Sequence, residues 1–170
     1  AQGAITKARW MALRDSRSST QTQGFRIDAV ATPHGHKTAF NSELFRVRED
    51  AEVLATIREW LPRAAECERG CHPRQIAAAV LGQLRALDGA LRAWREFWRH
   101  EWIGSSLLFM ADATGRADLK MIDFGVTTPH EAGLRHDQPW VMGNHEDGYL
   151  LGLANLIRLW SQLVKEDSWL

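Results

Sequence analysis

Apolar residues recur at helical spacing in two consecutive stretches of this chain. From about 49 to 65 they fall every three or four residues, at Val53, Leu54, Ile57 and Leu61, the stripe of an amphipathic helix. Gly70 and Pro73 then separate two elements, and proline suits the first position of a helix. A longer stripe follows over 73–98, at Ile76, Val80, Leu84, Leu87, Leu91, Trp94 and Trp98. These patterns predict helices over 49–65 and 73–98, and the second stripe is more typical of core packing than of a ligand site.

A third helix is predicted over 146–165. Its broad apolar face consists of Tyr149, Leu150, Leu153, Leu156, Ile157, Trp160, Leu163 and Val164. Asn144 and Asp147 stand where a capping residue and its third-position partner are expected. Glu146 adds a negative charge near the positive end of the helix.

Period-two alternation and turn chemistry predict two hairpins between these helices and before them. Residues 24–30 alternate like a half-buried strand, and the turn at 33–36 leads to a second strand ending near Phe40. Residues 102–110 and 119–124 read as strands joined by the turn at 114–116. Residues 16–23 and 129–143 read as polar loops, and residues 5–15 fit either a short helix or an extended segment. The expected fold class is α+β, one domain over 1–170, with hairpins forming part of an antiparallel sheet against packed helices.

Composition narrows the functional classes. Of the 170 residues, 45% are hydrophobic and 25% charged, a globular balance. Lysine plus arginine equals aspartate plus glutamate at 21 each, so no overall field favours nucleic acid or an acidic membrane. A local basic cluster could still bind a small polyanion. No apolar run approaches the roughly 20 residues of a membrane span.

The two cysteines, Cys67 and Cys71, lie four residues apart. A disulfide between them is one interpretation, and a zinc site with the adjacent His72 is another. Zinc would need further ligands, and the sequence offers no second cysteine–histidine pair. Free thiols are the favoured interpretation.

The most specific local signal is Asp123, which emerges from an apolar strand into the sequence Phe124-Gly125. Phosphoryl-transfer enzymes use such a carboxylate because Mg²⁺ prefers hard oxygen ligands. Taken alone, the tripeptide favours a plainer interpretation, a strand that ends in a turn-forming aspartate.

The tripeptide stands in a longer ordered set of motifs. HEWIGSSLLF at 100–109, IDFG at 122–125, TTP at 127–129 and GNHEDGYLLGL at 143–153 closely resemble the inositol phosphate kinase family in order and spacing. ITKARWM at 5–11, with Arg14, and GFRI at 24–27 look like the inositol trisphosphate 3-kinase branch. The resemblance covers most of the chain, and implies the larger C-terminal lobe of a two-lobed kinase.

The resemblance implies roles for five residues. Asp123 falls on the family's metal-binding aspartate, which holds Mg²⁺ against the phosphates of ATP, so ATP and Mg²⁺ are the implied cofactors. Ser105 and Ser106 fall in a motif that supports this site, although small residues capping or packing inside a hairpin explain them equally well. Lys7 and Arg14 fall in the basic segment that meets inositol phosphate. Without the resemblance, these two and Arg9 read as a solvated basic face.

The sequence departs from the family at several positions. The motif that supplies a lysine central to transfer is absent and is expected before residue 1, with the smaller ATP-binding lobe, so no catalytic residue is assigned within the chain. Two substrate-binding lysines are replaced, by Val126 and Ala31, and the arginine of the last motif is His145. A charge-assisted hydrogen bond contributes about 1.5–3 kcal/mol. Two lost contacts would therefore weaken substrate binding roughly a hundred- to ten-thousand-fold.

Two hypotheses follow. The first is an ATP-dependent inositol polyphosphate kinase, of which this chain is a fragment or a weakly active form, with an inositol phosphate as substrate and a cytoplasmic or nuclear location. Calmodulin, a partner of some relatives, would bind a segment upstream. The second is a degenerate, non-catalytic relative that binds inositol phosphate or serves as an interaction module. A protein-kinase fragment is disfavoured because the catalytic-loop motif is missing.

Overall fold

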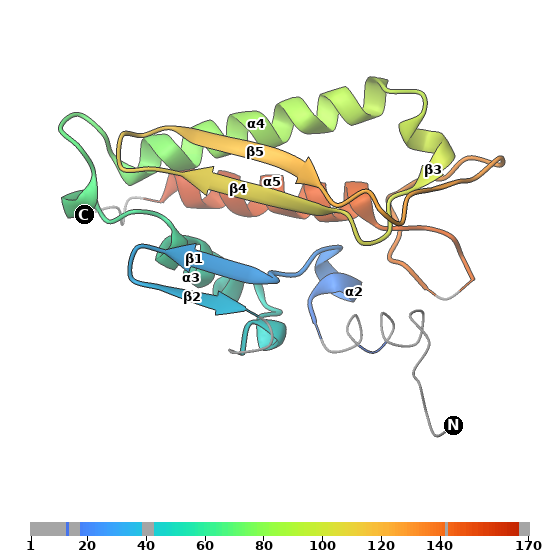
Figure 1. Ribbon diagram of the computed structural model, residues 1–170, viewed down its shortest axis with the longest axis horizontal. Helices are drawn as coiled ribbons and strands as arrows, with labels where there is room; N and C mark the ends of the chain where they lie inside the picture. The colour runs from blue at the N-terminus through green and yellow to red at the C-terminus, as the bar shows by residue number, and fades with distance from the viewer. Residues whose placement is uncertain (1–12, 14–17, 39–42, 142, 167–170) are drawn as a thin grey trace.

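Helix α5 (Tyr149–Lys165) is the element around which the other helices pack. The computed structural model describes residues 13, 18–38, 43–141 and 143–166. Figure 1 shows α4 (Pro73–Ala93) running alongside α5, with α2 (Thr20–Gln23) and α3 (Asp50–Trp60) on the opposite side of α5. Short 3₁₀ turns, η1 (Glu43–Arg46), η2 (Ala64–Glu66) and η3 (Phe97–Arg99), connect these elements. The mixture of helices and short antiparallel strands confirms the predicted α+β class.

The core lies where α3, α4 and α5 meet. Each predicted apolar stripe supplies fully buried side chains, among them Val53, Ile76, Val80, Leu84, Leu153, Leu159, Trp160 and Leu163. Burying one side chain of this size contributes about 1.5–3 kcal/mol. Packing therefore explains why the three helices could be predicted from their periodicity. No helix among the described residues has the length and apolarity needed to cross a bilayer.

Within the described residues, the strands form three separate two-stranded antiparallel sheets rather than parts of one sheet. Strands β1 (Ala29–Thr32) and β2 (Gly35–Thr38) form the first predicted hairpin beside α3. Strands β4 (Ser106–Ala111) and β5 (Ala117–Ile122) form the second, packed on α4. A third pair, β3 (His100–Glu101) with β6 (Thr128–Pro129), was not predicted because two-residue strands leave no periodic signal.

Two predicted helices end earlier than their apolar stripes suggested. Helix α3 stops at Trp60 instead of 65 because Pro62 disfavours helical backbone at Leu61, whose ψ is 141°. Helix α4 stops at Ala93 instead of 98. The chain then turns through η3, which inserts Phe97 into the core with 0% exposure, while Trp94 stays 47% exposed.

Helix α5 begins at Tyr149, three residues later than predicted, and the predicted capping pair is wrong. Its N-cap is Gly148, in the left-handed region at φ 68°. Asp147 Oδ1 accepts the N–H of Tyr149 at 3.0 Å. Asn144 instead accepts the N–H groups of Val141 and Glu146 within the preceding loop.

The segment before β1 also differs from its prediction. Residues 20–23 of the predicted polar loop form α2, and residues 24–28 of the predicted strand are not paired as a strand in the described chain. Phe25 and Ile27 nevertheless pack against the core. The alternation of apolar and polar residues here therefore reflects packing and not strand pairing. The carbonyl of Phe25 accepts the Ser19 hydroxyl at 2.6 Å.

Candidate functional site

Asp123 lies immediately after β5, where the β4–β5 hairpin ends, and its side chain is exposed. Its backbone is left-handed, with φ 62°, which is uncommon for a residue other than glycine. A turn follows, closed by the N–H of Thr127 donating to the carbonyl of Phe124 at 3.1 Å. Gly125, two residues later, has no left-handed φ. The unusual backbone conformation is at the aspartate itself.

Ser105 and Ser106 lie at the same end of the hairpin as Asp123. Ser105 closes a turn, because its N–H and hydroxyl both donate to the carbonyl of Trp102, at 3.3 and 2.9 Å. Ser106 is the first residue of β4 and pairs with Ile122. The structure thus brings three of the five predicted site residues together. The other two, Lys7 and Arg14, lie outside the described residues.

The outer face of the β4–β5 hairpin carries apolar side chains beside the ion pair of Asp118 and Lys120. Side chains alternate between the two faces of a strand, and the inner set, Leu107, Phe109, Leu119 and Met121, packs against the core. The outer set remains exposed, at 43% for Leu108, 38% for Met110 and 39% for Ile122, and Phe124 beyond the strand is 49% exposed. Leu108, Met110, Ile122 and Phe124 therefore form an exposed apolar strip that leads along the hairpin to Asp123, with Asp118 and Lys120 beside it.

A polar group lies on the neighbouring β3–β6 ladder. Glu101 contacts His145 Nδ1 at 2.5 Å and accepts the Thr128 hydroxyl at 3.2 Å. The rings of His130 and His145 lie 5.1 Å apart. Among the described residues, no group of three or more histidine, cysteine, aspartate or glutamate side chains is arranged to hold a metal. A metal at Asp123 would need ligands from elsewhere.

Sequence reasoning missed the pair of His136 and Asp147. His136 lies in the long polar loop and is 0% exposed, and the Asp147 side chain is 1% exposed. His136 Nδ1 lies 2.9 Å from both carboxylate oxygens, and Nε2 lies 3.0 Å from the carbonyl of Phe97. Asp147 Oδ2 also accepts the N–H of Trp102 at 2.8 Å. A histidine in a polar loop gives no periodic signal of burial, so the pattern could not reveal this pair.

Tyr149, the first residue of α5, lies beside this pair. Burial raises the pKa of its phenol, and the Asp147 carboxylate adds to the shift. Its ring meets Phe97 edge-on at 5.8 Å. Tyr149 is therefore a neutral packing residue at neutral pH.

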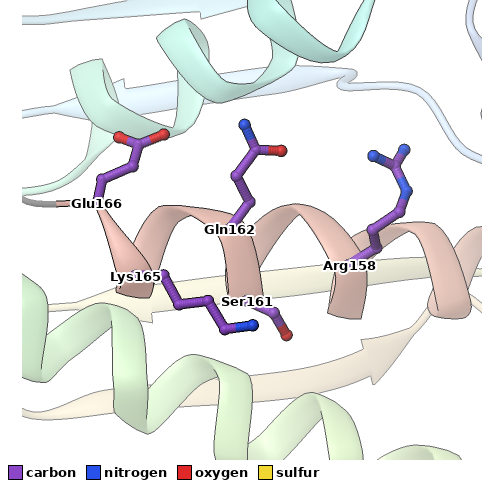
Figure 2. Close-up of a pocket in the computed structure, with 5 residues that line it drawn as sticks. All are labelled: Arg158, Ser161, Gln162, Lys165 and Glu166. Atoms are coloured by element: carbon purple, nitrogen blue, oxygen red, sulfur yellow. The ribbon is translucent and has the colours of Figure 1, made fainter.

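Two concave surfaces in the described part of the chain lie away from Asp123. One lies along the last turns of α5, lined by Arg158, Ser161, Gln162, Lys165 and Glu166 (Figure 2). Two of these side chains form ion pairs with α3, Arg158 with Asp50 and Glu166 with Arg58. The other is bordered by the β1–β2 hairpin and Glu59. Neither includes the aspartate.

The cysteines stand as free thiols, both half-buried. Burial raises the pKa of the Cys67 thiol, and the neighbouring Cys71 raises it further. Less of Cys67 is thiolate at neutral pH as a result, and thiolate is the metal-binding and nucleophilic form.

Comparison with known proteins defines the class. Residues 2–161 match the family model described as "IPK: Inositol polyphosphate kinase". The chain therefore belongs to the inositol polyphosphate kinase family, as the ordered motifs indicated.

Its relatives include inositol-trisphosphate 3-kinases. The human inositol-trisphosphate 3-kinase B is 39% identical over 168 residues, 98% of this chain and 16% of the relative. The human inositol-trisphosphate 3-kinase A is 39% identical over 167 residues, 97% of this chain and 34% of the relative. A Caenorhabditis elegans inositol-trisphosphate 3-kinase homolog is 33% identical over 163 residues, 95% and 31% of the two chains. The chain thus spans about a third or less of the length of these curated relatives.

A solved structure of inositol phosphate multikinase has a similar fold. The TM-score is 0.62 at 16% sequence identity, and the match covers 96% of this chain and 73% of the other. At that identity the likeness establishes the fold alone.

Proposed function

We propose that the chain is the part of an ATP-dependent inositol phosphate kinase that carries the metal-binding carboxylate, Asp123. The observation that carries the proposal is the exposed position of Asp123 directly after β5, with a left-handed φ, in a chain of this family. Strained conformations of this kind often occur at functional sites, where the surrounding structure maintains them.

The single carboxylate at Asp123 suits a magnesium ion that is held jointly with substrate phosphates. It does not suit a metal ion bound by protein ligands alone. Mg²⁺ retains several waters and is commonly held by one or two carboxylates together with the phosphates of a substrate. A single exposed carboxylate without a surrounding cluster of described ligands matches that pattern. When bound with ATP, the ion neutralises charge on the phosphate being transferred. Asp123 would hold and orient it.

The apolar strip beside Asp123 supports a nucleotide in the same place. Leu108 and Ile122 are exposed on the face that leads to the aspartate. A purine base offers flat apolar faces, and covering such side chains contributes roughly 25 cal/mol per Å². In this arrangement the base covers the strip while the phosphates reach Asp123.

The substrate side of the proposal rests on Lys7 and Arg14, which would bind the phosphates of an inositol phosphate. Arginine binds phosphate through two parallel hydrogen bonds, and lysine acts as a point charge. Val126, half-buried three residues after Asp123, offers neither charge nor a hydrogen bond. We therefore expect weak activity on inositol trisphosphate.

Val126 also favours a second candidate function, that of a relative that binds inositol phosphate without transferring phosphate. Val126 and Ala31 occupy the positions where the 3-kinase pattern has substrate-binding lysines. Calorimetric binding of inositol trisphosphate, with no phosphorylated product in the presence of ATP and Mg²⁺, would favour this candidate over the kinase.

The test is a kinase assay on three forms of the chain. Wild type, Asp123→Asn and Asp118→Asn are incubated with ATP, Mg²⁺ and inositol trisphosphate, and the product is separated by anion-exchange chromatography. Asp118 is the matched control, because it lies on β5 itself, its side chain is 49% exposed, and its carboxylate contacts the nearby Lys120 and the N–H of Leu119. We expect Asp123→Asn to lose about a hundredfold in rate or more, since it removes an electrostatic contact to the reacting phosphates, while Asp118→Asn changes little. Equal rates for the two variants would refute the role of Asp123.

A further inference from the structure

We infer that Asp147, held by His136, is a positioning residue that fixes the backbone on both sides of Asp123. The inference rests on the proposed function, because it assigns the pair to the same metal site. Neither residue contacts the exposed face of the hairpin. Their influence passes through the buried Trp102, in three steps.

The first step is the set of hydrogen bonds that holds the pair. The carbonyl of Phe97 can only accept a hydrogen bond, so His136 Nε2 carries a hydrogen. His136 Nδ1 faces both oxygens of Asp147, which also accept the N–H groups of Trp102 and Tyr149. Both ring nitrogens of His136 are therefore held by hydrogen bonds, Nε2 to the Phe97 carbonyl and Nδ1 to the Asp147 carboxylate. The ring of Phe97 packs against the imidazole, with the ring centroids 4.2 Å apart.

The second step connects Asp147 to the start of β4. Its carboxylate holds the N–H of Trp102 at 2.8 Å, and the carbonyl of the same tryptophan receives both donors of Ser105. The turn formed in this way delivers Ser106 into register with Ile122. Ile122 directly precedes Asp123, so this side of the aspartate is fixed by the ladder.

The third step connects the indole of Trp102 to the other side of Asp123. The indole is 7% exposed, and its Nε1 donates to the carbonyl of Phe97 at 3.1 Å. Its ring meets Phe124 edge-on at 6.0 Å. Both neighbours of Asp123 thus depend on the placement of one tryptophan, whose backbone is held by Asp147. Because the left-handed φ of Asp123 must be maintained by surrounding contacts, the placement of Trp102 fixes the direction of the Asp123 carboxylate.

The geometry offers a matched pair of substitutions at His136. Asparagine places its amide nitrogen near the position of Nδ1, so His136→Asn keeps a donor to Asp147. Glutamine places it near Nε2, so His136→Gln keeps the donor to Phe97 and loses the donor to Asp147. A second pair compares Asp147→Asn with Asp137→Asn, an exposed aspartate of the same loop that pairs with Arg135.

Two measurements on the chain separate this inference from the proposed function. The amide NMR signals of Asp123 and Phe124 are recorded without metal or nucleotide. Binding of Mn²⁺ with ADP is then titrated, in the wild-type and in the Asp123→Asn background. Loss of a supporting residue around a metal ligand commonly weakens metal binding about 10- to 100-fold.

We expect Asp147→Asn and His136→Gln to shift both amide signals and to weaken Mn²⁺–ADP binding about tenfold. His136→Asn and Asp137→Asn should stay within about threefold of wild type. In the Asp123→Asn background, Asp147→Asn should cause no further loss, because effects transmitted through one residue are not additive.

Unshifted amide signals, or an equal loss in both backgrounds, would overturn the inference, because the pair would then act on stability alone. If Asp123→Asn itself leaves Mn²⁺–ADP binding unchanged, the proposed function fails and the metal role of the pair fails with it. If Asp147→Asn does not fold, the two His136 variants decide the question, and equal behaviour of those two would also overturn the inference.

Discussion

Gly24 and Gly152 meet backbone to backbone, where the end of α2 touches the first turn of α5. A Cβ built on Gly152 would lie 2.6 Å from the carbonyl oxygen of Gly24, and one built on Gly24 would lie 2.4 Å from the nitrogen of Gly152. Gly24 also has φ 73°. The contact therefore requires glycine on both sides, and it fixes how closely the N-terminal segment approaches the central helix.

Replacing Gly152 with alanine should destabilise the protein although alanine is the better helix former. The added methyl must displace backbone, and overpacking of this kind costs about 1–3 kcal/mol. Denaturant unfolding measures the effect. Gly82, exposed within α4 with no atom near its missing Cβ, is the control, and Gly82→Ala should stabilise by about 0.5–1 kcal/mol. Stabilisation by both substitutions would show that the close approach does not exist.

Replacing Val126 with lysine should restore a phosphate contact near Asp123. One charge-assisted hydrogen bond contributes about 1.5–3 kcal/mol, which corresponds to a gain in affinity for inositol trisphosphate of roughly tenfold or more. Isothermal titration calorimetry gives the dissociation constant. Val126→Gln supplies similar length without charge and should gain little. If lysine and glutamine behave alike, charge at this position does not matter for binding.

The outer face of the hairpin should matter for nucleotide binding more than for stability. Leu108→Ser replaces a side chain that is 43% exposed, so we expect a change in unfolding free energy below about 1 kcal/mol. Binding of ADP should weaken about fivefold or more if a base covers this strip. Leu107→Ser, on the inner face, should instead cost about 2 kcal/mol or more in stability. Unchanged ADP binding in a folded Leu108→Ser variant would argue against the strip as a base platform.

Asp50 should give the protein a small acid-sensitive component of stability. The hydrogen bond from Arg158 is the main cause that lowers the pKa of Asp50, and Gln23 adds a second hydrogen bond. Because the folded-state pKa is depressed, the stabilisation is present above the ordinary aspartate pKa of about 3.9 and is lost as pH falls through the folded value. The pair is exposed, so the contribution is only about 0.2–1 kcal/mol.

Unfolding free energies of wild type and Asp50→Asn, measured from pH 7 down to about pH 3, test this component. The difference between the two proteins should be constant near neutral pH and should shrink below about pH 4. A difference that grows on acidification would contradict the direction of the shift.

Periodicity predicted the elements that bury apolar faces. It failed to predict where those elements begin and end, because local backbone and side-chain interactions determine the boundaries. The stripes of α3, α4 and α5 were visible because their side chains form the core. The C-terminal ends of α3 and α4 were not visible, because Pro62 and the insertion of Phe97 end the helices before their apolar stripes end. The start of α5 depends on the left-handed Gly148 and on Asp147, whose side chain serves the helix and the loop at once.

The candidate site was predicted in part. Asp123 and the two serines could be placed because a strand, a turn and a family resemblance pointed to one end of one hairpin. The left-handed conformation of Asp123 and the buried pairing of His136 could not be predicted. Both depend on contacts between residues more than 10 positions apart, such as Asp147 with Trp102, which no local pattern records.

The side chain of Gln83 on α4 affects which parts of the protein unfold locally. Its amide donates to the carbonyl of Ala117 at 2.8 Å and its carbonyl accepts the N–H of Leu119 at 2.9 Å, so the helix serves β5 as a neighbouring strand would. Amide exchange should consequently be slow at Leu119 and fast along β2, whose residues are exposed or half-exposed. Asp123, which follows β5, is thus attached to a unit that stays folded when the β1–β2 hairpin unfolds locally.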